Sequence, residues 1–178
     1  TYRLPIGARI ELSYFDGNRG ASSFIAFTRN NPLTRRFHQA ERELRGWVLK
    51  MDHHFDSGFY LAAEAEREDR NYPRSPLGLQ GHNVHRWGCD VGYDWSKQGS
   101  LAAYYHHEDS DAETFGSRSF TTRDWTYDTH DETRAFGVIL GAGGPESRSH
   151  LTVDFFRSEG RGRYVTTSAG DIDPFPVL

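Results

Sequence analysis

The sequence has little cysteine, little hydrophobic content and no long apolar run. Its 178 residues include a single cysteine, Cys89, so an internal disulfide is excluded, and no Cys-x-x-Cys-His motif is present to attach a c-type haem. Only 36% of the residues are hydrophobic. The longest apolar run, residues 136–144, is less than half as long as the roughly 20 residues that a membrane helix needs. A helical membrane span is therefore excluded.

An excess of positive charge is also lacking. The formal net charge is -4, whereas nucleic-acid-binding domains are normally basic. Arginine clusters occur at residues 35–36 and 157–163, but they are interleaved with glutamates, as is typical of solvated segments. The sequence therefore predicts no nucleic-acid partner.

Aromatic residues and glycine are abundant instead. Aromatic residues make up 14% of the chain, which argues against disorder, because disordered chains are poor in them. The 18 glycines and 7 prolines leave little room for uninterrupted helix. Strict alternation of apolar and polar residues runs through residues 10–14, 59–66, 87–95 and 151–155. Such alternation places the two sets on opposite faces of a β-strand.

Turn-forming residues separate these strands. We predict turns at residues 16–20, 56–58, 96–99 and 144–147, where Gly, Asp, Asn and Ser gather. They join four hairpins, which pair residues 10–15 with 21–28, 45–55 with a strand from 59, 86–95 with a strand from 101, and 134–143 with a strand from 151. The predicted fold is all-β, with antiparallel up-and-down hairpins and about eight strands, in a barrel or an open, curved sheet. The hairpin domain covers residues 10–160, between extensions at 1–9 and 161–178.

Long polar connections are predicted on the side opposite the short turns, at residues 29–41, 70–85 and 110–133. Short turns opposite long loops are typical of outer-membrane barrels, and Trp87 and Trp95 resemble residues of an interfacial aromatic girdle. An ordinary antiparallel sheet with one solvated face gives the same alternation. Both interpretations remain open on the pattern alone.

Three segments carry a family resemblance: residues 28–36 (Thr-Arg-Asn-Asn-Pro-Leu-Thr-Arg-Arg) before an amphipathic strand, residues 86–95 followed by 101–113, and residues 124–131. Over residues 10–160 the chain resembles the decahaem-associated outer-membrane β-barrels of the MtrB/PioB type. The resemblance implies a non-catalytic protein that sheaths a multi-haem cytochrome, with the haem on the partner and no cofactor bound by this chain. The family's barrels are far longer, which implies a fragment or a shortened relative.

Two other functions remain open for a protein of the Gram-negative cell envelope. The first is an extramembrane accessory subunit, on the periplasmic side, that stabilises a membrane photosynthetic reaction-centre or respiratory complex. The second is a small-ligand or metal-binding envelope barrel. An enzyme is the least supported, because the sequence has no Gly-x-Ser-x-Gly motif and no phosphate-binding loop, so no catalytic residue is predicted.

Candidate ligands for a metal are sparse. His106 and Glu108 can share one face of a strand, and His130 could add a third ligand from a loop, but two ligands on a strand do not make a site. Solvated polar residues at a strand end explain them better, so we predict no metal site. Trp and Tyr dominate the binding energy of many protein interfaces, so aromatic residues are the candidates for contact with a partner. The first candidate is Trp125, in a predicted polar loop, and the set is Trp125, Tyr127, Trp95 and Tyr93.

Overall fold

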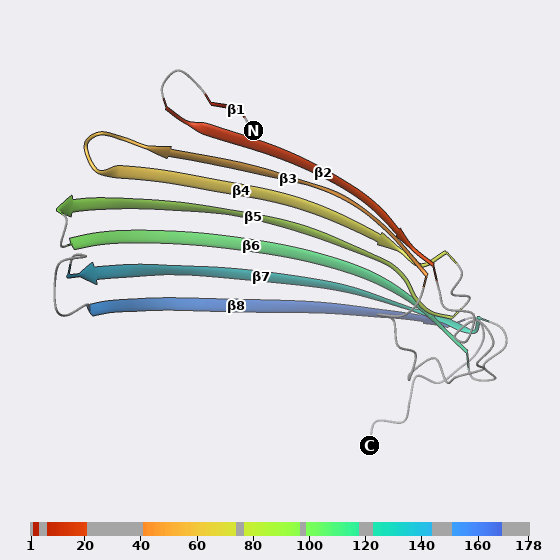
Figure 1. The fold of residues 1–178 in the computed structure, drawn as a ribbon. Helices are drawn as coiled ribbons and strands as arrows, with labels where there is room; N and C mark the ends of the chain where they lie inside the picture. The colour runs from red at the N-terminus through yellow and green to blue at the C-terminus, as the bar shows by residue number, and fades with distance from the viewer. Residues whose placement is uncertain are drawn as a thin grey trace.

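The computed structural model describes residues 2–3, 7–20, 41–73, 77–96, 99–117, 123–143 and 151–168. They form one sheet of eight strands (Figure 1). The strands are β1 Tyr2–Arg3, β2 Arg9–Arg19, β3 Arg42–His54, β4 Phe59–Asn71, β5 Gly78–Ser96, β6 Gly99–Gly116, β7 Trp125–Ala142 and β8 Leu151–Ser168.

The strands pair in sequence order, and every neighbouring pair is antiparallel. Figure 1 shows them as a single curved layer, which bends near the end where β4 leads to β5 and β6 leads to β7. We call this end the loop end and the other the turn end. The predicted all-β fold, with antiparallel up-and-down strands in an open, curved sheet, is confirmed. No helix that could span a membrane occurs in the part of the chain that the structure describes.

Two of the predicted short turns lie where expected. Between β3 and β4 the turn closes with a hydrogen bond from the Phe55 amide to the Phe59 carbonyl (2.8 Å), and Gly58 adopts a φ of 91°, which side chains disfavour. Between β5 and β6, Ser96 faces Gly99 across the hairpin. Ala142 of β7 faces Leu151 of β8, while the predicted turn at 144–147 lies outside the described residues.

The predicted first hairpin is wrong. Residues 16–19 do not turn: they continue β2, and Arg19 faces Arg42 of β3 at the end of an unbroken ladder. β2 pairs with β3, and residues 21–28, the predicted partner strand, lie outside the described residues. Gly17 misled the prediction, because a glycine beside Asp and Asn is also typical of a turn, yet here the ladder with β3 holds it extended.

The long polar loops are also corrected. β4 reaches Asn71 and β5 begins at Gly78, while β6 reaches Gly116 and β7 begins at Trp125. Most of the predicted loops at 70–85 and 110–133 is therefore strand, and β8 likewise continues past residue 160. Backbone hydrogen bonds to the neighbouring strands hold these segments extended although neither of their faces is continuously apolar, and alternation cannot reveal such a strand.

This layer has almost no hydrophobic core. Among the described residues, the buried apolar side chains are Ala8, Tyr72, Leu77 and Val84, whereas many large apolar side chains are exposed. The two edges of the sheet add a second constraint. β2 and β8 run in the same direction, because antiparallel steps alternate between them, so direct closure would make a parallel pair. An all-antiparallel barrel therefore needs an odd number of further long strands.

Candidate functional site

The register sorts the side chains onto two faces. Residues that face each other across the strands lie on the same face, and neighbours along a strand lie on opposite faces. We call the face that carries Leu61, Val91 and Val138 the belt face, and the other the opposite face; the register aligns these three residues through Ala103.

An apolar belt crosses the turn-side half of the belt face on all seven long strands. Its residues are exposed or half-buried although they are apolar. Trp87 and Trp95 lie on this face of β5, and the segment is nine residues long when both are counted, close to the roughly 9–11 that a tilted strand needs to cross a bilayer. The belt consists of Ile10, Leu12, Tyr14, Trp47, Leu49, Met51, Leu61, Ala63, Ala65, Trp87, Cys89, Val91, Leu101, Ala103, Tyr105, Phe136, Val138, Leu140, Leu151, Val153 and Phe155.

Beyond the belt, the same face becomes charged. We call this loop-side part of the strands, from Arg67, His85, His107 and Arg134 to the loop end, the projecting half. On β6 it spans ten residues, or roughly 33 Å of extended chain. Charged and polar groups continue across it, for example Asp111 of β6 opposite His130 of β7. β5, β6, β7 and β8, with 18 or 19 residues each, are thus about twice as long as the belt requires.

The opposite face is predominantly polar at the level of the belt, although Val48, Ile139 and Phe156 also lie on it. A ladder of ion pairs crosses it: Lys50 Nζ lies 3.0 Å from Glu64, and Arg86 lies 3.4 Å from Glu66 and 2.6 Å from Glu108. These pairs link β3, β4, β5 and β6 across three strand boundaries.

A shallow depression of about 320 Å³ opens beside this ladder. Gly88 forms part of its floor, and a side chain at this position would collide with the His106 ring. Charged walls surround the floor, contributed by Glu64, Arg86, Asp90 and Glu108.

The opposite face remains polar in the projecting half. His82 Nε2 lies 2.8 Å from the Ser110 hydroxyl, and its Nδ1 lies 3.4 Å from Arg70. Partial burial, followed by the positive charge of Arg70, lowers the pKa of His82.

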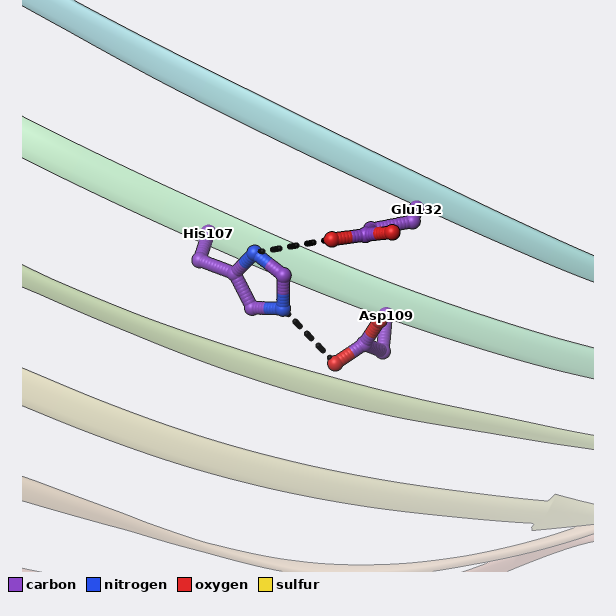
Figure 2. Close-up of side chains that lie close together, drawn as sticks. All are labelled: His107, Asp109 and Glu132. Atoms are coloured by element: carbon purple, nitrogen blue, oxygen red, sulfur yellow. Dashed lines mark hydrogen bonds and ion pairs between the residues drawn. The ribbon is translucent and has the colours of Figure 1, made fainter. Parts of the chain in front are cut away.

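His107, Asp109 and Glu132 meet on the belt face just beyond the belt. Figure 2 shows the His107 ring between the two carboxylates, with Nε2 2.8 Å from Asp109 and Nδ1 3.9 Å from Glu132. The carboxylates thus face different ring nitrogens, and Arg134 Nε donates to Glu132 at 2.6 Å. Although the three side chains could supply metal ligands, a single ion cannot use both ring nitrogens. The cluster is better explained as a histidine that links two acids across β6 and β7.

The metal candidates from the sequence do not come together. His106 and Glu108 share the opposite face, as predicted, with His106 3.9 Å from Asp90 and Glu108 paired with Arg86. His130 lies in strand β7 rather than in a loop, and on the belt face. There it contacts Asp111 at 2.8 Å, and this hydrogen bond raises the pKa of His130.

The aromatic candidates for partner contact divide between the faces. Tyr93 and Trp95 lie at the turn end of the belt face, where Tyr93 packs on Phe59 with ring centroids 4.4 Å apart. Tyr127 stacks on Tyr164 on the opposite face, at 6.0 Å. Trp125 is the first residue of β7, so its predicted place in a polar loop is wrong, and its ring covers Gly116.

The sequence reasoning missed the cross-strand groups. His107 and Asp109 are two residues apart and so share a strand face, which the sequence could have shown. Glu132 joins them only through the β6–β7 register, and Glu64 lies beside Gly88 only through the β4–β5 register.

The comparison with protein families identifies the chain. Residues 2–173 match the family described as "Putative outer membrane beta-barrel porin, MtrB/PioB". The chain belongs to this family. A search of curated proteins finds no match. Membership agrees with the resemblance found in the sequence, and it supports a structural role in the outer membrane of the cell envelope. The apolar belt is the feature that such a location requires.

Proposed function

We propose that this MtrB/PioB-family chain forms part of an outer-membrane barrel wall that sheaths a multi-haem cytochrome. The observation that carries the proposal is the two-faced wall. At one level of the same strands, an apolar belt lies on one face and an ion-paired polar surface lies on the other. Lipid on the belt face and a hydrated partner on the opposite face satisfy both surfaces.

The wall acts by position rather than by chemistry. A ladder of backbone hydrogen bonds across seven long strands makes a rigid surface, and the projecting half extends it beyond the bilayer. The haems belong to the partner, and the chain separates that partner from the surrounding lipid.

Extraction of membranes provides the first test. A wall inserted through the belt stays with the membrane at high salt and alkaline pH and is released only by detergent. Release without detergent would overturn the membrane wall and favour an extramembrane accessory subunit of a photosynthetic or respiratory complex.

Mild solubilisation provides the second test. A sheath retains its partner, so the purified protein should carry stoichiometric haem absorbance, although the chain itself has no c-type haem motif. A haem-free protein that stays in the membrane fraction would contradict the cytochrome partner while leaving the barrel wall standing.

A further inference from the structure

The opposite face carries an excess of acids at the level of the belt. The registers align rows of side chains that cross the sheet behind the apolar belt. Three bases lie in these rows: Arg9, Lys50 and Arg86. The acids in the same rows are Glu11, Asp52, Glu64, Glu66, Asp90, Glu108 and Asp154.

The bases do not neutralise this surface. Arg86 is shared between Glu66 and Glu108 at 3.4 Å and 2.6 Å, so one guanidinium faces two carboxylates. Asp90 lies near a histidine rather than near a lysine or arginine, with His106 Nε2 3.9 Å away. Like charges gathered on one sheet face repel each other. The approach of further positive groups therefore stabilises this surface electrostatically.

Three of these acids line the depression at Gly88. Gly88 contributes only backbone to its floor, the His106 ring lies against Gly88, and Glu64, Asp90 and Glu108 line the depression from three neighbouring strands. The side chains of these acids are 47%, 41% and 42% exposed, so their carboxylates are accessible from the opposite face. A volume of about 320 Å³ is enough to accept the end of a long basic side chain.

We propose that this acidic surface is the docking site for a basic protein surface, and that a lysine or arginine side chain of the partner enters the depression between Glu64, Asp90 and Glu108. The proposal rests on the barrel-wall function, which places a partner against this face. Charge complementarity selects the partner, because the apolar belt and lipid behind the sheet form a low-dielectric layer that directs the field of the acids toward the partner.

Oligolysine serves as the first probe, titrated into the detergent-solubilised protein with oligoglutamate as the reference. We expect oligolysine to bind, and binding to weaken steeply as salt is added. The double variant Asp90→Asn/Glu64→Gln should bind on the order of tenfold more weakly. The matched control, Asp111→Asn/Glu113→Gln, removes two acids from the belt face of the projecting half and should bind as the unaltered protein does.

Three outcomes overturn the docking proposal. Oligolysine binding that the Asp90/Glu64 variant leaves unchanged places the interaction elsewhere. A loss in the Asp111/Glu113 control alone assigns it to the projecting half. Binding of Mg²⁺ without binding of oligolysine assigns the acids to mobile cations rather than to a protein.

Haem retention separates this proposal from the function on which it rests. The haem absorbance that co-purifies from native membranes should fall severalfold in the Asp90/Glu64 variant and remain unchanged in the control variant. Equal haem in all three proteins overturns the acidic docking site but leaves the sheath in place. The absence of haem from the unaltered protein overturns the sheath itself.

Discussion

The turn-side half of the strands, which carries the apolar belt (the belt half), and the projecting half share one backbone ladder. Their side chains face different environments. On the belt face the first carries exposed apolar side chains, such as Leu140 at 45% and Val138 at 43% exposure. The second carries Asp111, His130 and Glu132 on the same face of the same strands. Side chains point to the two faces in turn in both halves, but only in the belt half is one of the faces apolar. Strand length in this protein is therefore not set by the membrane, because the ladder of β5 to β8 continues well beyond the apolar belt.

The two halves are also stabilised by different means. Each large side chain of the belt gains about 1.5–3 kcal/mol when it is fully covered, so the belt half depends on lipid or a partner. In the projecting half, the large exposed apolar side chains among the described residues are few, namely Tyr164 and Val165. The cross-strand pairs of the projecting half, such as His130 with Asp111, are exposed to water and contribute little each, so this half depends mainly on the ladder of backbone hydrogen bonds.

The largest effect is expected from a charge in the middle of the belt. Val138→Arg places a guanidinium against lipid, and we expect it to lower the free energy of unfolding in lipid vesicles by about 2–4 kcal/mol. Unfolding in guanidinium, followed by tryptophan fluorescence, measures the loss.

Two matched substitutions test whether position rather than charge is responsible. Ile139→Arg, one residue away, faces Asp154 on the opposite face, and Asp128→Arg lies on the belt face of the projecting half. Both variants should insert into the lipid vesicles as the unaltered protein does. Equal losses in all three variants would remove the distinction between the halves.

A smaller loss is expected where the halves meet. A side chain at Gly46 would collide with the backbone carbonyl of Arg67 and with the Phe15 ring. Gly46→Ala should therefore cost about 1–3 kcal/mol in the same unfolding assay. Gly17→Ala is the control, since its new methyl group meets no atom within 4 Å. A neutral Gly46→Ala would show that the sheet relaxes freely at this level.

The ion-pair ladder should contribute less. Arg86→Ala leaves Glu66 and Glu108 without their shared partner, but the Arg86 side chain is 41% exposed, so water screens the loss. We expect a decrease below about 1 kcal/mol, and one that shrinks as salt is added. A loss as large as that of Val138→Arg would contradict a hydrated opposite face.

The smallest effect concerns His82 in the projecting half. Because the fold lowers its pKa from 6.5, the folded chain resists protonating this ring. Its contribution to stability is thus fully present above pH 6.5 and is lost as the pH falls through the lowered value. An NMR titration should place the His82 midpoint below 6.5, and His82→Gln should flatten the acid side of the stability profile. A midpoint at or above 6.5 would mean that Arg70 and burial do not act on the ring.

The sequence predicted the strands that have one apolar face and failed where both faces are polar. Residues 87–95 alternate cleanly and lie in β5 as expected. Residues 110–116 of β6 carry Asp111 and Glu113 on one face and small or polar side chains on the other, so they were taken for a loop. The sites show the same division. The shared face of His106 and Glu108 follows from spacing alone, but their neighbours Asp90 and Arg86 depend on the β5–β6 register.

By itself the sequence determined an all-β antiparallel sheet, the positions of the hairpin turns at 56–58 and 96–99, and the family. Alternation and turn chemistry are local properties, so they can be read along a single strand. The tertiary structure decided how far each strand continues, that the individual apolar faces join into one belt, and that the acids of several strands gather behind it. Those features arise from pairing between segments distant in the sequence, and the register that sets them is fixed only when neighbouring strands meet.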